Sequence, residues 1–315
     1  MIRSAIPQIE LRGLHRVFAD THAVNDVSFE VQAGEVFGYI GPNGAGKTTS
    51  MRILATLDEP TAGDALVDGF SVVDDPDRVR RRLGFMPDYF GTYQNVNVRE
   101  YLDFFARAYG LRGTERTRAL AYVMDFTKLD TLARKSIDGL SKGMKQRLCL
   151  GRTMIHDPSV LVLDEPAAGL DPRARIELRE MIARLAENGK AVLISSHILT
   201  ELAEVCHRVG IIEQGRLLAV GSVEEISARA HDCGMVRIRV LSDVERLHQW
   251  LAAHDHVADL RCDGKLTTFT HFGDQQSEAA LLRGIIGAGF DVVEFGARHQ
   301  SLEDVFLRVT EGRVQ

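Results

Sequence analysis

The chain has 315 residues, of which 45% are hydrophobic and 26% are charged. This length suits two domains of ordinary size, and the composition is that of a globular protein, not of a collagen-like, coiled-coil or disordered chain. The formal net charge of −6 argues against a protein that works by neutralising nucleic-acid phosphates. We therefore expect no nucleic acid among its partners.

The cysteines and the hydrophobic runs indicate the compartment. The 4 cysteines stand far apart without a C-x-x-C pair, which favours a reducing compartment over a disulfide or zinc framework. No run approaches the roughly 20 apolar residues that a membrane span requires, and the first residues lack a secretory pattern. We expect any membrane association to come through a partner.

The N-terminal region reads as strands followed by a strand-to-helix unit. Residues 9–38 alternate between apolar and polar side chains, which predicts short antiparallel strands. Residues 36–40 are apolar throughout and lead through a glycine-rich turn into a helical pattern over 47–57. A buried strand that enters a helix in this way starts an α/β domain.

The next part of the chain is predicted to be helical, and after it strands and helices alternate again. Apolar residues at helical spacing predict helices over 98–109 and 114–132, and we expect a helical insertion at about residues 95–155. Apolar runs at 160–163 and 191–194 predict buried strands, with a helix over 173–187 between them. This return of alternating strands and helices favours a parallel sheet.

The C-terminal part has a pattern of its own. A hairpin is predicted at 209–220, and the composition changes near residue 230. We expect one domain over 1–228 and a small α+β domain over 229–315. Its predicted strands and helices are strand 236–241, helix 243–253, two strands near residues 260 and 267, helix 277–288 and strand 290–294.

The motif with the clearest chemistry follows the predicted strand at 36–40. It matches the phosphate-binding pattern G-x-x-x-x-G-K-[ST]. Glycines let backbone N–H groups point at the phosphates of a nucleotide, Lys47 adds a mobile positive charge, and the Thr48 hydroxyl is suited to ligate Mg²⁺. The residues assigned to nucleotide binding are Gly41, Pro42, Asn43, Gly44, Ala45, Gly46, Lys47, Thr48 and Thr49.

A second part of a nucleotide site is predicted where the apolar strand at 160–163 ends in Asp164 and Glu165. We expect Asp164 to hold Mg²⁺ through water and Glu165 to act as general base for the attacking water. Acids at such a place are also typical of a helix N-cap. The phosphate loop earlier in the chain favours the nucleotide site.

A third motif lies between these two. Leu140, Ser141 and Gly143 match the L-S-G-G-Q signature, and the chain resembles the ATP-binding subunits of ATP-binding cassette (ABC) transporters. Lys142 and Met144 depart from the signature in a way that is similar to the export, ABC-2 drug-type branch. The resemblance implies a P-loop NTPase fold, an α/β architecture with a RecA-like parallel core, an antiparallel β subdomain and a helical insertion.

The resemblance also implies roles for single residues. Ser141, Lys142 and Gly143 would act at the nucleotide of a second subunit; the structural alternative for Ser141 is a plain helix N-cap. Phe18 would stack on adenine, Asp171 would communicate with the opposite site, and His197, which follows Ser195 and Ser196, would reach the γ-phosphate. The structural alternatives are a half-buried strand residue at 18, a helix start at Asp171-Pro172 and a structural or surface histidine at 197.

Asp88 stands where the family commonly has glutamine. A carboxylate offers Mg²⁺ a hard oxygen but cannot donate a hydrogen bond as an amide does. We assign Asp88 as a metal ligand beside Thr48 and Asp164.

Aromatic residues are concentrated just after Asp88. We expect them either to form the core of the helical insertion or to line a groove that receives a helix of a membrane partner. They are Tyr89, Phe90, Tyr93, Tyr101, Phe104, Phe105 and Tyr109.

The implied function is an ATPase that uses ATP and Mg²⁺ and pairs head to tail with a second copy or a paralogous subunit. It would drive a separate transmembrane permease through contacts near residues 85–110, export a multidrug, antibiotic or lipid-like cargo, and lie peripherally on the cytoplasmic face of the cell membrane. Residues 300–307 are similar to the C-terminal extension of export-type ATPases.

Two other functions compete with transport. One is a soluble ABC-type ATPase of translation, DNA maintenance or regulation. Translation-type members resemble two cassettes in one chain, whereas this chain has one. Repair-type members carry a long coiled coil between the two phosphate motifs, whereas no heptad run separates Lys47 from Asp164 here. A P-loop kinase would need neither Ser141 nor His197.

Overall fold

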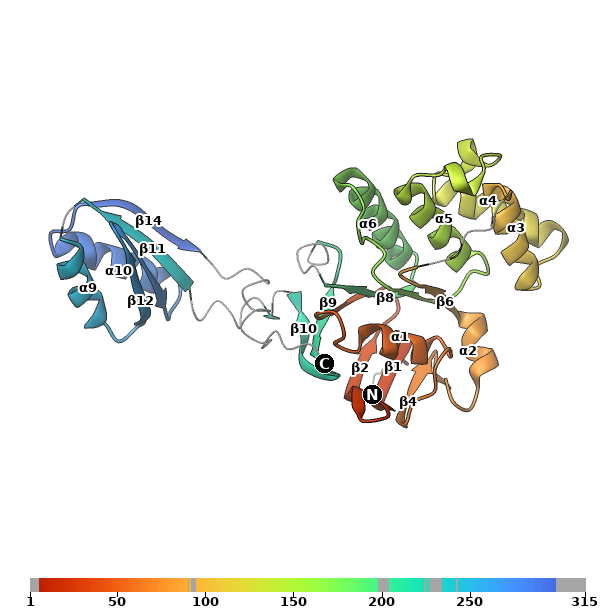
Figure 1. Cartoon of the computed structure of the whole chain (residues 1–315), viewed down its shortest axis with the longest axis horizontal. Helices are drawn as coiled ribbons and strands as arrows, with labels where there is room; N and C mark the ends of the chain where they lie inside the picture. The colour runs from red at the N-terminus through yellow and green to blue at the C-terminus, as the bar shows by residue number, and fades with distance from the viewer. Residues whose placement is uncertain are drawn as a thin grey trace, which may run out of the picture. The chain divides into compact units, whose positions relative to one another are not determined.

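The computed structural model describes residues 6–89, 91, 95–197, 204–223, 225–226, 234–241 and 243–298. The chain divides into two compact units between Gly221 and Ser222, and each unit is described by itself (Figure 1). The boundary expected between residues 228 and 229 lies outside the described residues.

The first unit is built around a six-stranded sheet. Its strands are β3 (Val36–Ile40), β6 (Leu83–Met86), β7 (Val160–Leu163), β8 (Ala191–Ser196), β9 (Arg208–Glu213) and β10 (Arg216–Ser222). They lie in the order β10-β9-β3-β8-β7-β6, and the pairs β3–β8, β3–β9, β7–β8 and β6–β7 are parallel. The predicted parallel core is confirmed. Its central strands are buried throughout, which explains their continuous apolar sequences.

An antiparallel sheet covers one face of this core, as predicted. It consists of β1 (Ile9–Phe18), β2 (Thr21–Val31), β4 (Ala62–Val67) and β5 (Phe70–Ser71), in the order β2-β1-β4-β5. One hydrophobic core joins this sheet, helix α1 (Lys47–Leu54) and the facing side of the parallel sheet. Within it, Phe29 of β2 stacks on Phe37 of β3 with ring centroids 4.7 Å apart. This packing fixes α1 between the two sheets.

Helices cover the other face of the parallel sheet (Figure 1). They include α5 (Lys142–Met154) and α6 (Pro172–Glu187), while α2 (Pro76–Arg82) leads into β6. The helical insertion contains α3 (Val98–Ala108), α4 (Gly113–Phe126), the short 3₁₀ turns η1 (Asp130–Leu132) and η2 (Ile137–Gly139), and α5. A capping box begins α3, because Asn97 and Glu100 each accept a hydrogen bond from the other's backbone N–H. A Cβ on Gly84 would overlap the carbonyl oxygen of Thr153, so glycine lets β6 and α5 pack closely.

The insertion contacts the core through a stacked pair of rings. Tyr109, just after α3, stacks on His156, just after α5, with ring centroids 3.8 Å apart. The Nε2 atom of His156 lies 3.3 Å from the carbonyl oxygen of Leu83, at the start of β6. Burial lowers the pKa of His156 to about 4. The folded chain therefore holds this imidazole in its neutral form.

The second unit is a small α+β structure. Its elements are β11 (Gly234–Val240), α9 (Val244–Ala252), β12 (Val257–Asp263), β13 (Leu266–His271), α10 (Gln275–Gly287) and β14 (Val292–Arg298). The sheet order β12-β13-β11-β14, with antiparallel neighbours, is the split β-α-β or ferredoxin-like arrangement. Both helices pack on one sheet face, where Leu247, Leu251 and Ile285 meet Ile238 and Phe269.

None of the helices in the described ranges combines the length and the apolar character that a membrane span needs. Residues 300–307, expected to belong to a C-terminal extension, lie outside the described residues.

Acidification is expected to destabilise the chain through His156. Because its pKa is lowered in the folded chain, the unfolded chain binds a proton first as the pH falls from the ordinary value of 6.5 towards about 4. The loss of stability across this window is on the order of 3 kcal/mol. His156→Gln should remove that part of the loss in thermal melts recorded at several pH values.

The half-buried His248 of α9 provides the control for this experiment. His248→Gln should follow the wild-type pH dependence. The same pH dependence for wild type and His156→Gln would contradict the interpretation.

Candidate active site

The phosphate loop lies where β3 ends and α1 begins, at the carboxyl edge of the parallel sheet. Gly44 and Gly46 have φ values of 79° and 104°, which L side chains rarely adopt. A Cβ on Gly46 would also overlap the carbonyl oxygen of Ala23. The glycines therefore allow a tight loop whose N–H groups lead directly into the N-terminus of α1, a geometry suited to phosphate.

Lys47 is held over this loop. Its side chain is nearly buried, and its Nζ atom donates to the carbonyl oxygens of Gly41 (2.6 Å) and Pro42 (3.0 Å). The same nitrogen lies 3.7 Å from Oε1 of Glu165. Burial lowers the pKa of Lys47, while the charges of Glu165 and Asp164 oppose this effect. The two predicted motifs thus meet at one place.

Asp164 follows β7 and is almost completely buried. Its backbone N–H donates to the carbonyl oxygen of Met86 at 2.8 Å, which joins it to the end of β6. Burial raises the pKa of Asp164, whereas hydrogen bonds from Ser195 and Thr48 lower it; the charges of Asp88 and Glu165 add to the rise. Among the residues that the structure describes, no group donates a hydrogen bond to its Oδ2 atom.

Glu165 lies between a lysine and a histidine. Its Oε2 atom is 2.8 Å from Nδ1 of His197, and its Oε1 atom faces Lys47. The backbone has a φ of 46°, in the left-handed region, and its N–H donates to Oγ of Ser195 at 2.9 Å. The structure thus brings Lys47, Asp164, Glu165 and His197 together.

Ser195 is the residue near the acids that the sequence patterns do not single out. It is fully buried near the end of β8 and contacts both acids. Ser195 and Ser196 end β8 at positions that are as buried as its apolar residues, but this burial is known only from the structure, and the sequence gives no local signal for it.

The signature residues lie at the start of α5. Ser141 is its N-cap and accepts a hydrogen bond from the backbone N–H of Met144 at 3.3 Å. This is the plain helix cap given above as the structural alternative for Ser141. The exposed side chain of Lys142 reaches the loop after Glu165, where a Cβ on Gly169 would overlap its amine. A cavity of about 130 Å³ separates the start of α5 from the start of α6, and Ser141, Gly143 and Asp171 are among its lining residues.

Asp171 is likewise a helix N-cap. It accepts a hydrogen bond from the backbone of Ala174 at 3.0 Å, and Pro172 occupies the first turn of α6. A capping role leaves the side chain at a helix start, so it does not conflict with a role at a second subunit.

Phe18 and Asp88 lie at the surface. Phe18, the last residue of β1, is 44% exposed, and the guanidinium of Arg16 lies 4.4 Å from its ring centroid, which fits the half-buried strand residue of the structural alternative and leaves part of the ring accessible. Asp88 accepts a hydrogen bond from the backbone N–H of Tyr89 at 2.7 Å and raises the pKa of Asp164 through its charge. Asp88 therefore lies within electrostatic reach of the buried acid.

Some of the aromatic residues after Asp88 lie in the core of the helical insertion, and others are exposed, as a groove for a partner would require. Tyr101 is buried and Phe105 is half-buried, whereas Tyr89, Phe104 and Tyr109 are exposed. Phe90 and Tyr93 lie outside the described residues. Part of the cluster is core, and part is available at the surface.

The residues around Asp164 fit a magnesium ion. Mg²⁺ is usually held by one or two carboxylates together with phosphate oxygens and water. Asp164 offers a buried oxygen without a hydrogen-bond donor, and the Thr48 hydroxyl interacts with the same carboxyl group. The described residues contain no cluster of three or more His, Cys, Asp or Glu side chains suited to a metal, so bound phosphate would have to supply further ligands.

A glycine-rich loop at a helix start, a buried lysine and an acid pair at the end of another parallel strand of the same sheet define a P-loop NTPase. A family profile described as "ABC transporter" matches residues 24–168. The chain belongs to the ABC transporter family, and it is an ATP-binding subunit with ATPase activity.

Some relatives match nearly the whole chain. The Nod factor export ATP-binding protein I of Burkholderia thailandensis is 34% identical over 311 residues, 99% of both chains. The protein of the same name from Rhizobium sp. (strain N33) is 35% identical over 302 residues, 96% of both. The probable multidrug ABC transporter ATP-binding protein YbhF of Escherichia coli K12 is 35% identical over 249 residues, 79% of this chain and 43% of that protein.

Solved structures resemble the first unit's fold. An ATP-binding subunit of an ABC transporter has a TM-score of 0.64 and 31% identity, over 70% of this chain and 92% of its own. A dimeric bacterial ABC transporter cassette has a TM-score of 0.61 and 24% identity, over 68% of this chain and 98% of its own.

Replacing Gly46 by alanine is expected to weaken ATP binding. The new Cβ would overlap the carbonyl oxygen of Ala23 at a φ of 104°, so the loop must move. Nucleotide affinity, measured by titration with a fluorescent ATP analogue, should fall at least about 10-fold, because the loop supplies much of the phosphate site.

Gly287→Ala is the matched control, since a Cβ on Gly287 meets no atom within 4 Å. This variant should bind the analogue as wild type does. Unchanged affinity in Gly46→Ala would show that the loop does not depend on this glycine.

Proposed function

We propose that this ATPase powers export through a separate transmembrane permease of the ABC-2 type. The observation that carries the proposal is the similarity to a Nod factor export ATP-binding protein over 99% of both chains, which includes the second unit. The signature substitutions Lys142 and Met144 support the same branch. The proposed cargo is a multidrug, antibiotic or lipid-like compound; among the relatives, one name refers to Nod factor export and another to multidrug transport.

In the proposed reaction, Glu165 accepts a proton from the water that attacks the γ-phosphate. The hydrogen bond from His197 orients its carboxylate, and His197 also reaches the γ-phosphate. Lys47 exchanges the carbonyl oxygens of Gly41 and Pro42 for phosphate oxygens. The N–H groups of the phosphate loop stabilise the charge on the transferred group, a contribution typical of phosphoryl transfer.

Thr48 and Asp164 are the residues that would hold Mg²⁺, with Asp88 close to them. The ion, when bound, neutralises negative charge on the β- and γ-phosphates. The buried Asp164 contributes a fixed negative charge to this edge of the sheet, and Phe18 is proposed to stack on the adenine ring.

The proposed assembly has two ATPase subunits, either two copies or this chain with a paralogue. Ser141, Lys142 and Gly143 would meet the nucleotide of the other subunit, and Asp171 would lie near the opposite site. The permease would contact the region near residues 85–110, where Tyr89, Phe104 and Tyr109 are exposed. The subunit would then lie peripherally at the cytoplasmic face of the membrane, without nucleic acid.

Glu165→Gln should lower the rate of ATP hydrolysis by about 100-fold or more while nucleotide binding persists, because an amide cannot accept the proton. Phosphate release measured at saturating MgATP tests this. Glu245→Gln, at an exposed acid in α9, should hydrolyse ATP as wild type does. Undiminished hydrolysis in Glu165→Gln would remove Glu165 from the role of base.

The same variant is expected to form an ATP-dependent dimer. Because it binds ATP without consuming it, light scattering after gel filtration should show twice the subunit mass with MgATP. Adding Ser141→Arg should prevent this by placing a bulky side chain at the start of α5, whereas Thr117→Arg on the exposed side of α4 should not. A dimer that tolerates Ser141→Arg would contradict the proposed head-to-tail contact.

A further inference from the structure

Ser195 uses its single hydroxyl for two contacts with the acid pair. Its Oγ atom donates to Oδ1 of Asp164 at 2.7 Å and accepts a hydrogen bond from the backbone N–H of Glu165 at 2.9 Å. A serine hydroxyl has one proton and two acceptor sites. Its only donor capacity is thus directed at Asp164.

The register of the sheet explains why this serine lies there. β7 and β8 are parallel neighbours, and their last paired residues are Leu163 and Ile194. Asp164 and Ser195 are the next residues on each strand, so their side chains leave the sheet side by side. The contact therefore results from strand pairing between segments that are far apart in the sequence.

Each contact restricts one acid. The bond to Oδ1 restrains one oxygen of the Asp164 carboxylate and leaves Oδ2 as the buried oxygen to which no described group donates. The bond from Glu165 stabilises a backbone with a φ of 46°, a conformation that is unfavourable for an ordinary residue. Without the hydroxyl, both restraints would be lost together.

We propose that Ser195 is a positioning residue for ATP hydrolysis, which directs one oxygen of Asp164 towards the metal and holds the backbone of Glu165 in place. The proposal rests on the function proposed above, in which Asp164 holds Mg²⁺ and Glu165 is the base. Ser195 itself contacts neither the phosphates nor the attacking water in this mechanism.

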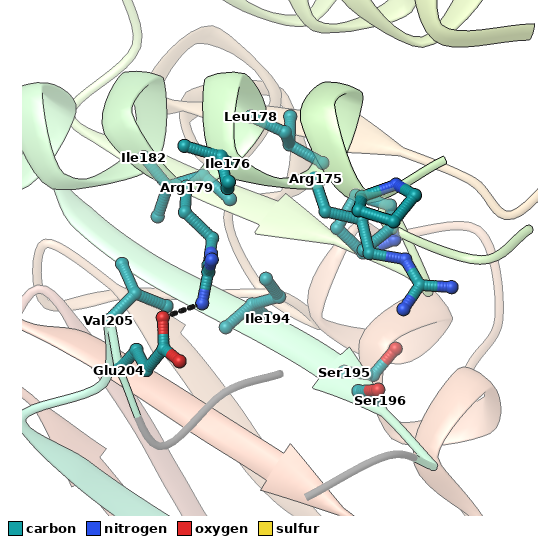
Figure 2. Close-up of a pocket in the computed structure, with 13 residues that line it drawn as sticks. Arg175, Ile176, Leu178, Arg179, Ile182, Ile194, Ser195, Ser196, Glu204 and Val205 are labelled. Atoms are coloured by element: carbon teal, nitrogen blue, oxygen red, sulfur yellow. Dashed lines mark hydrogen bonds and ion pairs between the residues drawn. The ribbon is translucent and has the colours of Figure 1, made fainter. Parts of the chain in front are cut away.

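A cavity beside Ser195 supplies a conservative variant. Figure 2 shows Ser195 and Ser196 at one end of a cavity of about 260 Å³ under α6, which Ile182 and Ile194 also line. A threonine at position 195 would keep the hydroxyl, and its additional methyl group would have room on the cavity side. Ser195→Thr should therefore preserve the two hydrogen bonds.

The first measurement follows turnover. Ser195→Ala is expected to lower kcat by about 10-fold or more with little change in KM for ATP, because positioning acts on the chemical step rather than on nucleotide affinity. Ser195→Thr should restore kcat. Thr127→Val, which removes another fully buried hydroxyl far along the chain in the insertion, should keep wild-type turnover.

The second measurement does not depend on turnover. Mn²⁺ is titrated against each variant with a non-hydrolysable ATP analogue, and free Mn²⁺ is followed by electron paramagnetic resonance. Residues that orient metal ligands typically change metal affinity by about 10-fold to about 100-fold. We expect Ser195→Ala to weaken Mn²⁺ binding by about 10-fold and Ser195→Thr to bind as wild type does.

The outcomes distinguish a failure of the positioning role of Ser195 from a failure of the metal role of Asp164, on which the proposal rests. Wild-type kcat and Mn²⁺ affinity in Ser195→Ala, with at most a lower melting temperature, would overturn the positioning role alone. If Asp164→Asn also kept wild-type Mn²⁺ affinity, the metal role of Asp164 would fail, and the inference with it. If Ser195→Ala does not fold, the nearly isosteric Ser195→Cys replaces it, and the same two readouts decide.

Discussion

Opposite charges buried where the parallel strands end are the constraint on which this site depends. Lys47 and Asp164 are nearly inaccessible to solvent, and an unpaired buried charge would cost several kcal/mol. Their surroundings offset this cost: carbonyl oxygens of the loop accept from the lysine, Ser195 donates to the aspartate, and Glu165 faces the lysine. The sheet order makes this possible, because β3, β8 and β7 are neighbours and their carboxyl ends meet.

The buried strands could be predicted closely from the sequence, because full burial requires a continuous apolar run. The predicted strand at 160–163 has the bounds of β7. The predicted strand at 191–194 stops two residues before β8 does, since Ser195 and Ser196 resemble a loop when their partners are unknown. Ser195 was missed for the same physical reason: its partner lies on another strand, and no local pattern reveals it.

Helix ends were less predictable than helix positions. The helix expected over 47–57 ends at Leu54, and Thr56 takes a left-handed φ of 57°. The helix expected over 114–132 ends at Phe126, followed by Lys128 at 55°. Neither residue is one that usually favours this conformation, so tertiary packing outweighs local preference. The phosphate loop, by contrast, is a local motif, and its glycines predict the left-handed backbone conformation directly from the sequence.

The backbone conformation of Gly169 limits variation in the loop that follows Glu165. The φ of 65° there suits only glycine and, less well, asparagine or aspartate. A Cβ at 169 would overlap the amine of Lys142, but that amine is the end of an exposed, flexible side chain and can move aside. The backbone, and not the signature residue at 142, therefore restricts position 169, so the signature can vary at 142 without a matching change in this loop.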